Sequence, residues 1–275
     1  MRACVGFKTP SKRLEIFSKT MKGWGWPEHA LPAYIESHVH RKFMDRAKNE
    51  YVLVPTFRLP TLIHTRSANA KWLYELSNTN PVWIHPRDAA RIGIETAELV
   101  RITTRIGYYV NKAWVTEGVR PGVVACSHHL GRWRLFDAPD PGADRWASAK
   151  VEKEEIGPGQ MRFRRIEDVG PFKSRDPDSS RIWWTDGGVH QNLTFCVQPD
   201  PVSGMQCWHQ KVTVTRAQPG DRYADVFVDL NKSMEAYREW LALTRPAPPH
   251  GPGNLRRPLW FARAVRPAEE AYHVA

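Results

Sequence analysis

The sequence of 275 residues has little cysteine and lacks long apolar runs, and both absences exclude classes of protein. No stretch approaches the roughly 18 consecutive apolar residues that span a bilayer, so we expect no transmembrane helix. The first residues are basic, but the apolar core of a signal peptide does not follow them. Nothing in these residues distinguishes a cytoplasmic from a periplasmic location. The 4 cysteines, Cys4, Cys126, Cys196 and Cys207, include no C-x-x-C pair, which argues against a zinc site and a disulfide framework.

No nucleic-acid-binding motif and no internal repeat accompany the net charge of +11. Lys and Arg are scattered along the chain instead of gathering in one helix or tail. An excess of positive charge also suits a phosphate-bearing cofactor, an acidic partner subunit or solubility. We therefore expect no nucleic-acid partner.

Composition and periodicity predict a mainly β fold with short helices. Hydrophobic residues form 41% of the chain, enough for a core, while 22 Pro and 18 Gly favour many loops. A helix is expected over 87–92, with Pro86 at its first position and Gly93 after its last turn. Alternating residues at 99–105 and 108–115 predict a β-hairpin. Further strands are expected at 51–57, 82–84, 123–126 and 211–216. Together, these elements follow an order that suits a small closed barrel better than a doubly wound sheet.

Three regions differ in composition from this barrel domain, which we place at 51–216. Residues 1–50 combine a Pro turn with a Gly- and Pro-rich stretch. Residues 136–180 carry Asp, Pro, Gly and mixed charges with little periodicity, so we expect an exposed insertion that is partly ordered at best. Residues 217–275 contain an amphipathic helix at 230–243, whose apolar stripe we expect to be a packing surface, and then a Pro-rich extended arm.

A loop crowded with hydrogen-bonding side chains follows the strand expected at 51–57. Loops of this kind commonly hold ligands, because the strand fixes the base while the loop stays free of ladder hydrogen bonds. On composition alone, a solvated surface loop explains these residues equally well. The side chains in question are His64, Thr65, Arg66, Ser67, Asn69 and Lys71.

The segment that contains this loop resembles a known family over its whole length. The polar "HT-S" loop is followed by the elements NP…HP-DA, V-I-T and V-PGVV…HH-G-W, within the run IHPRDAARIGIETAELVRITTRIGYYVNKAWVTEGVRPGVVACSHHLGRW. The segment resembles the C-terminal cofactor-binding domain of molybdopterin oxidoreductases of the dimethyl-sulfoxide-reductase superfamily. The resemblance implies a six-stranded double-psi β-barrel with extended N- and C-terminal arms. It also implies molybdopterin guanine dinucleotide as the cofactor.

Ser127, His128, His129 and Gly131 directly follow the strand expected at 123–126. The resemblance implies that they lie at the cofactor, with hydrogen bonds to the pterin; structural histidines are the alternative. Cys126 with the two histidines could suggest a metal site. Adjacent histidines on a strand, however, point to opposite faces, and no further ligand stands at a workable spacing. We therefore predict no metal ligand among these residues.

A third element contains Asn192 and Asp200 in the pattern N-L-T-x(5)-D-P-x-S-G. It resembles the late Asn…Asp…Ser-Gly element of the family, in which the Asn amide hydrogen-bonds the edge of the pterin. The resemblance therefore implies that Asn192 and Asp200 bind the cofactor. A turn-forming amide at a strand end is the alternative explanation of Asn192.

The resemblance implies that the chain is the C-terminal portion of the large subunit of a molybdenum- or tungsten-dependent oxidoreductase. In this superfamily the metal ligand and the iron–sulfur cysteines come from upstream domains, and we find neither in these residues. We therefore expect a truncated or separately encoded portion that is inactive by itself, with 1–50 as a junction to the missing catalytic domains. Its expected partners are those domains or a separate catalytic chain, together with an iron–sulfur electron-transfer subunit.

A non-enzymatic binding module built on the same barrel is the alternative function, because one fold serves many functions. This alternative predicts no pterin in the native protein and a partner captured by the Pro-rich tail. The substrate, and the choice between molybdenum and tungsten, stay open at this point because both depend on residues near the metal.

Overall fold

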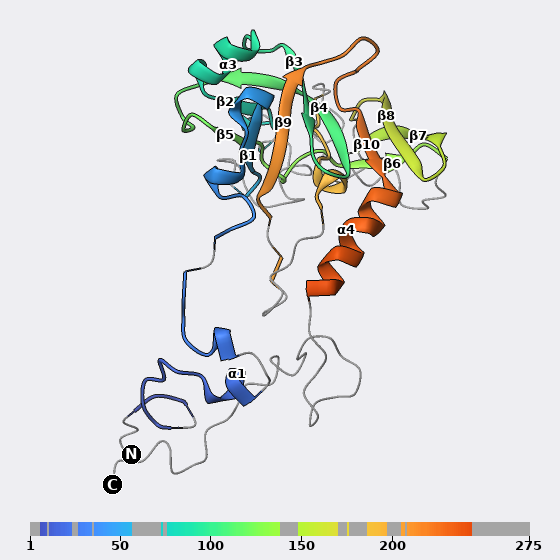
Figure 1. Ribbon diagram of the computed structural model, residues 1–275. Coiled ribbons are helices and arrows are strands. Elements are labelled where there is room, and N and C mark those ends of the chain that lie inside the picture. Colours follow the sequence, from blue (N-terminus) through green and yellow to red (C-terminus); the bar gives the residue numbers. More distant parts are fainter. Residues whose placement is uncertain are drawn as a thin grey trace. The chain divides into compact units, whose positions relative to one another are not determined.

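Two compact units make up the chain, one of Met1–Ser37, Pro199–Met205 and Glu239–Ala275, the other of His38–Gln198 and Gln206–Arg238. The computed structural model (Figure 1) describes residues 6–9, 11–23, 27–34, 36–56, 73, 76–137, 148–169, 175, 186–196, 205–206 and 208–243. In the first unit, α1 (Lys19–Gly23) and η1 (Pro27–His29) lie together, because the Ser18 amide donates to the Ala30 carbonyl over 2.7 Å.

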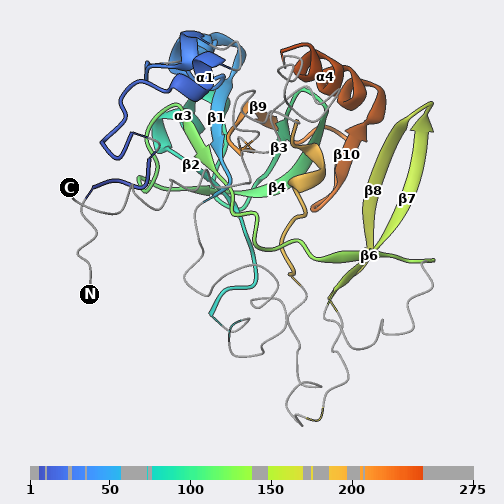
Figure 2. The same ribbon diagram turned by 90° about the horizontal axis from the view of Figure 1, so that it is seen from below.

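The second unit is built around a closed barrel of six strands (Figures 1 and 2). Each strand pairs with the next in the order β2-β5-β1-β9-β3-β4, and β2 also pairs with β4, which closes the ring. The pairs β1–β5 and β2–β4 are parallel and the others antiparallel. The prediction of a mainly β fold with a closed six-stranded barrel is therefore confirmed, and the pairing is consistent with the double-psi description. The strands are β1 (Glu50–Val54), β2 (Val82–Ile84), β3 (Leu99–Thr103), β4 (Gly107–Val115), β5 (Val123–Ala125) and β9 (Gln210–Arg216).

The interior of the barrel is filled by the alternate residues of its strands. In β1 and β3 every second residue is buried, as the period of two in a strand requires. Each such aliphatic side chain contributes about 1.5–3 kcal/mol relative to an exposed one. Alternation in the sequence therefore predicted both the strands and the face that each presents to the core. The fully buried members include Tyr51, Leu53, Val82, Ile84, Val100, Ile102, Val124, Val212 and Val214.

Helix α3 (Pro86–Ile92) confirms the helix expected at 87–92. Gly93 ends it in the left-handed conformation with φ 68°, which glycine adopts without steric cost. At the other end, His85 is the N-cap, and its Nδ1 accepts from the Arg87 amide over 3.1 Å. The sequence analysis did not identify His85 as a cap, because Ser, Thr, Asp and Asn dominate that position.

The expectation for 136–180 is wrong in one respect, because this segment contains a regular β-hairpin. Strands β7 (Ala149–Gly157) and β8 (Gln160–Glu167) pair antiparallel, and β6 (Trp133–Leu135) joins β7 (Figure 2). β10 (Val226–Asp229) connects the hairpin to β4 of the barrel. Charged residues occupy many positions of the hairpin, and its apolar side chains do not alternate regularly. A solvated insertion has a similar composition, which is why the hairpin was not predicted.

Helix α4 (Leu230–Leu243) confirms the helix expected at 230–243. Its Ala236 is buried in a small cluster with Ile106 and Val228. Met234 is 49% exposed, and the expectation that the apolar stripe is a packing surface stays a prediction. Where the helices are described, none combines the length and the apolar character needed to cross a membrane. Most of the Pro-rich arm lies outside the described residues.

Candidate functional site

One end of the barrel brings the predicted site segments together. The parallel pairing of β1 with β5 places Val54 beside Ala125, so both strands end at the same side. The antiparallel pairing of β1 with β9 places the start of β9 there too, since Leu53 pairs with Gln210. We call this side the loop end, and define it by Pro55 and by residues 126–131 and 186–192, which lie at or beyond these strand ends.

A pocket of about 310 Å³ lies where β3 ends and β9 begins, and none of Pro55, 126–131 and 186–192 is among its lining residues. This volume is the lower limit of the size usual for small-molecule sites. Lys211 contributes to its wall, but its ammonium group donates to the Phe43 carbonyl over 2.9 Å and pairs with Glu50 over 2.6 Å. The lining residues are His38, Thr103, Thr104, Arg105, Cys196, Gln210, Lys211, Val212 and Thr213.

The base of the first predicted loop lies against the second predicted element. His128 donates to the Pro55 carbonyl from its amide over 3.2 Å and from Nδ1 over 2.6 Å. Pro55 directly follows β1, so the chain enters the polar loop beside His128. The loop residues themselves, His64, Thr65, Arg66, Ser67, Asn69 and Lys71, lie outside the described part of the chain.

His128 and His129 lie side by side, which corrects one geometric expectation. Their ring centroids are 4.2 Å apart with a tilt of 30°, whereas residues on a strand would point to opposite faces. The reason is that β5 ends at Ala125, so the histidines follow the strand instead of belonging to it. Ser127 is fully buried, and its Oγ lies 2.7 Å from Nδ1 of His129. Among the described residues, no group of three His, Cys, Asp or Glu is arranged to hold a metal ion.

Gly131 allows the backbone of 126–131 to approach the backbone of Val189 closely. Its φ is +93°, and a Cβ at this position would lie 2.0 Å from the carbonyl carbon of Val189. Its amide donates to the Gly187 carbonyl over 2.8 Å. Any larger side chain would separate 126–131 from the segment that leads to Asn192.

Asn192 is exposed at the start of η7 (Asn192–Thr194). Its side-chain amide makes no hydrogen bond within the described part of the chain. The preceding residue, Gln191, is 1% exposed and donates from Nε2 to the Cys126 carbonyl over 2.7 Å. Its Oε1 is buried without a partner among the described residues. The sequence analysis did not identify Gln191, for which the only signal was its position beside Asn192; Asp200 lies outside the described residues.

A half-buried carboxylate anchors the start of segment 186–192. Asp186 accepts from the Tyr223 hydroxyl over 2.5 Å and from the Gly188 amide over 3.0 Å, and its other oxygen lies 3.0 Å from the Lys112 ammonium. Burial acts to raise the pKa of Asp186, but these three donors outweigh it and leave the pKa below its usual value. Burial, and then the charge of Asp186, raise the pKa of Tyr223. Tyr223 therefore remains a donor and Asp186 a charged acceptor.

Cys126 is a structural thiol at this end of the barrel. Burial raises its pKa to about 12, although hydrogen bonds from neighbouring side chains act to lower it. It donates to the Asn80 carbonyl over 3.2 Å and accepts from Nδ2 of Asn111 over 3.4 Å. A neutral, fully buried thiol is neither a metal ligand nor a nucleophile.

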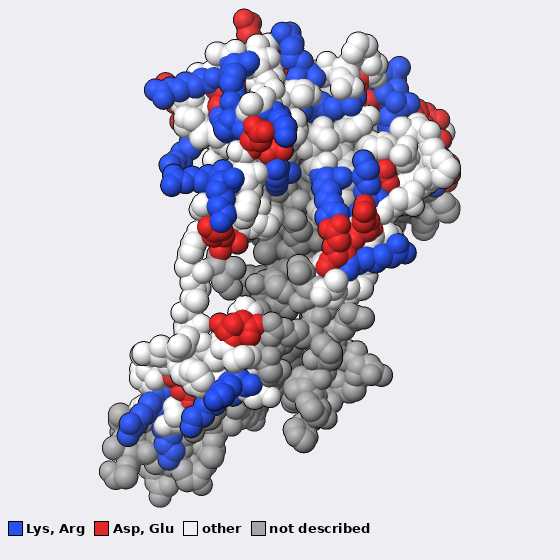
Figure 3. All heavy atoms as spheres, in the orientation of Figure 1, with Lys and Arg blue, Asp and Glu red and all other residues white. Residues whose placement is uncertain are grey.

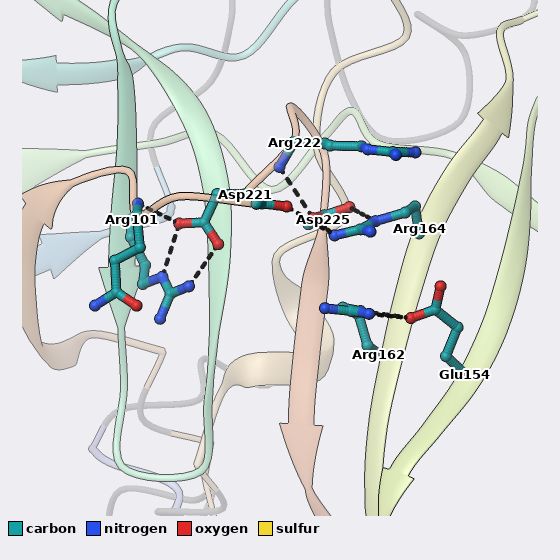
Figure 4. A network of polar contacts seen from close by, with 9 residues as sticks. Arg101, Glu154, Arg162, Arg164, Asp221, Arg222 and Asp225 are labelled. Atoms are coloured by element: carbon teal, nitrogen blue, oxygen red, sulfur yellow. Dashed lines mark hydrogen bonds and ion pairs between the residues drawn. The ribbon is translucent and has the colours of Figure 1, made fainter.

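Charged residues gather on the face formed by β3, β4, β10, β8 and β7 (Figure 4). Arg164 pairs with Asp225 through two hydrogen bonds of 3.0 and 2.7 Å, and Arg101 pairs with Asp221 through bonds of 3.0 and 2.5 Å. Arg162 likewise binds Glu154. On the face shown in Figure 3, Lys and Arg alternate with Asp and Glu. Most of the arginines described on this face are paired with carboxylates, so we assign no anion-binding site to the described part of it.

Comparison with known proteins identifies the barrel. Residues 52–155 match the model of the molydopterin dinucleotide binding domain. A trimethylamine-N-oxide reductase of Haemophilus influenzae is 33% identical over 131 residues, which are 46% of this chain and 15% of that protein. The arsenate respiratory reductase molybdopterin-containing subunit ArrA of Chrysiogenes arsenatis is 26% identical over 194 residues, 60% of this chain and 21% of its own.

A third relative is the thiosulfate reductase molybdopterin-containing subunit PhsA of Salmonella typhimurium. It is 33% identical over 117 residues, which are 42% of this chain and 14% of that protein. The chain thus spans between 14% and 21% of the length of these three relatives. The matched domain accounts for a molybdopterin guanine dinucleotide cofactor, as the sequence analysis expected.

Proposed function

Because this chain belongs to the family of molybdopterin dinucleotide-binding domains of the dimethyl-sulfoxide-reductase superfamily, we propose that its loop end holds part of the cofactor. The observation that supports the proposal is the convergence of the predicted elements. Gln191 bonds to the backbone of Cys126, and His128 bonds to Pro55 at the base of the first loop. Segments far apart in the sequence therefore begin or end at one side of the barrel.

The residues at the loop end fit a pterin in chemical character. The exposed amide of Asn192 offers a donor and an acceptor, and Gln191 Oε1 is a buried acceptor without a described partner. A pterin edge presents N–H donors and a carbonyl acceptor, so such groups complement it. Ser127, His128 and His129 supply further hydrogen-bonding groups, and Gly131 keeps the two segments in contact. When bound, the cofactor carries the molybdenum or tungsten at which oxidation and reduction take place.

We assign the first loop to the phosphate-bearing part of the cofactor. Its hydroxyl, imidazole and cationic side chains are the groups that bind pyrophosphate. We assign Asp200, like Asn192, to hydrogen bonding with the pterin or guanine ring. The residues of the first loop in this assignment are His64, Thr65, Arg66, Ser67, Asn69 and Lys71.

In the complete protein, we propose, the chain is the cofactor-binding portion of a molybdenum- or tungsten-dependent oxidoreductase. All three relatives are several times longer than the matched segment. The metal ligand would come from the remaining catalytic domains or from a separate catalytic chain, and an iron–sulfur subunit would exchange electrons with it. The chain alone would then hold cofactor without turning over substrate.

Replacing Asn192 tests the assignment. Asn192→Ala removes an exposed amide, so we expect an unchanged thermal midpoint and a clear loss of cofactor from the purified complex. Guanosine monophosphate released by acid hydrolysis, per mole of chain, measures retention. Asn231→Ala is the control: it removes an exposed amide from the first turn of α4, where the side chain donates to the Pro158 carbonyl over 3.0 Å. Equal retention in both variants and the parent would contradict the role of Asn192.

A further inference from the structure

Asn80 is a fully buried amide two residues before β2. Pro81 follows it and restricts the backbone of Asn80 to extended conformations. A polar side chain with no exposure is stable only where its hydrogen-bonding groups are satisfied. The partners of Asn80 therefore show which parts of the chain it holds.

The side chain of Asn80 binds two segments of the loop end at once. Its Nδ2 donates to the Ser127 carbonyl over 2.7 Å and to the Val189 carbonyl over 3.1 Å. Its Oδ1 accepts from the Val189 amide over 2.7 Å. The amide thus bonds both backbone groups of Val189, as a neighbouring strand residue would, while it also holds the backbone that leads to the histidines.

Two glycines allow this arrangement. A Cβ at Gly188 would lie 2.5 Å from Oδ1 of Asn80, and φ there is +74°. A Cβ at Gly131 would lie 2.0 Å from the carbonyl carbon of Val189. Val189 therefore lies between Asn80 and Gly131, and 126–131 and 186–192 are both positioned by contact with it.

Only an amide of this length can make these bonds. In aspartate, the oxygen that replaces Nδ2 would face the carbonyl oxygens of Ser127 and Val189, and an aliphatic side chain would leave three backbone groups unsatisfied. The backbone carbonyl of Asn80 also accepts from Nδ2 of Asn111 over 2.8 Å. The contacts of Asn80 therefore place it at the centre of the uncharged network below the candidate site.

We propose that Asn80 is a positioning residue of the dinucleotide site: it sets the placement of 126–131 relative to 186–192 without contacting the cofactor. The part that concerns the cofactor rests on the proposed function. Loss of the amide would release Val189 and displace Asn192 and His129 from each other. Retention of cofactor would then fall although the groups assigned to bind it are intact.

The test compares Asn80→Asp and Asn80→Ala with Asp88→Asn and Asp88→Ala in the full chain. Asp88 is 3% exposed, and it binds the Gly122 amide over 2.7 Å at the opposite end of the barrel. Hydrogen–deuterium exchange reports the placement of the segments, and released guanosine monophosphate reports the cofactor. Asn80→Asp keeps the side-chain volume but loses the two donated hydrogen bonds. Asn80→Ala loses the hydrogen bonds without placing a carboxylate in the interior. An effect common to both variants therefore comes from the lost hydrogen bonds.

For the Asn80 variants we expect faster exchange at Val189 and across 186–192, with the barrel strands still protected. We also expect about a tenfold lower cofactor content, the scale seen when the outer partners of metal ligands are removed. The Asp88 variants should lose protection near Gly122 and keep their cofactor. Unchanged exchange at Val189, or equal loss throughout the barrel, would overturn the positioning role.

The exchange measurement also separates this inference from the proposed function. A parent chain without dinucleotide would overturn the proposed function alone, because exchange at Val189 is measured without cofactor. Faster exchange there with full cofactor retention would overturn the link between Asn80 and the site.

Discussion

The loop end and the charged face of Figure 4 are both polar, but different forces hold them together. At the loop end, neutral amides bind backbone groups in full burial, as Asn80 does with Val189. On the charged face, Arg101, Arg162 and Arg164 bind carboxylates, and all three arginine side chains retain some exposure. Neutral buried bonds specify one geometry, whereas ion pairs near the surface depend on salt and pH.

This difference suits the two regions to different tasks. The loop end must present Asn192 and the histidines at fixed positions, and buried hydrogen bonds resist displacement because breaking one leaves a desolvated group unpaired. The charged face only has to keep the β7–β8 hairpin against β10. Exchange of one ion pair for another would serve that purpose equally well.

The largest expected effect comes from Gly131→Ala, which would break the loop end by steric overlap. Positive φ and the 2.0 Å approach to Val189 both oppose a Cβ, so we expect a loss of about 3 kcal/mol or more in the free energy of unfolding. Gly220→Ala is the matched control, since Gly220 has φ +89° but no atom within 4 Å of its Cβ position. Denaturant titration of both variants measures the difference. Equal losses would mean that backbone strain, and not the contact with Val189, decides the effect.

A smaller effect is expected on the charged face, where burial should decide the strength of each pair. Arg164→Ala leaves the carboxylate of Asp225, 1% exposed, without its main partner, so we expect a loss of about 3 kcal/mol. Arg162→Ala removes a pair whose side chains are 28% and 29% exposed, and should cost no more than about 1 kcal/mol. Unfolding at low and high salt measures both. Similar losses for the two variants would contradict the assumption that burial separates them.

The smallest expected effect concerns Asp186, a charged group that anchors the segment leading to Asn192. Its lowered pKa means that its contribution is present above the unfolded pKa, about 3.9, and is lost as the pH falls through the folded value. Asp186→Asn should cost about 1–2 kcal/mol at neutral pH and should lose less stability between pH 5 and pH 3 than the parent. Thermal midpoints across these pH values measure this. An identical acid dependence in variant and parent would show that other carboxylates cause it.

Much of the fold could be predicted from local pattern. Strands β3, β4 and β9 follow from alternation, β1, β2 and β5 from short apolar runs, and α3 from Pro86 and Gly93, because these signals act within a few residues. The hairpin β7–β8 was not predicted, since its strands are rich in charged residues and its partner β10 lies about 60 residues away in sequence. The candidate site was predicted by resemblance, and the roles of its residues stay predictions.

What the sequence determined by itself is thus the set of elements, their buried faces, and the family to which the barrel belongs. Only the tertiary structure decided which polar residues hold the loop end together. Asn80, Gln191 and Asp186 have no distinctive local pattern, because their partners are backbone groups and side chains brought close by barrel closure. It also showed that Gly131 is needed for contact with Val189, a requirement that depends on two segments meeting across about 60 residues of chain.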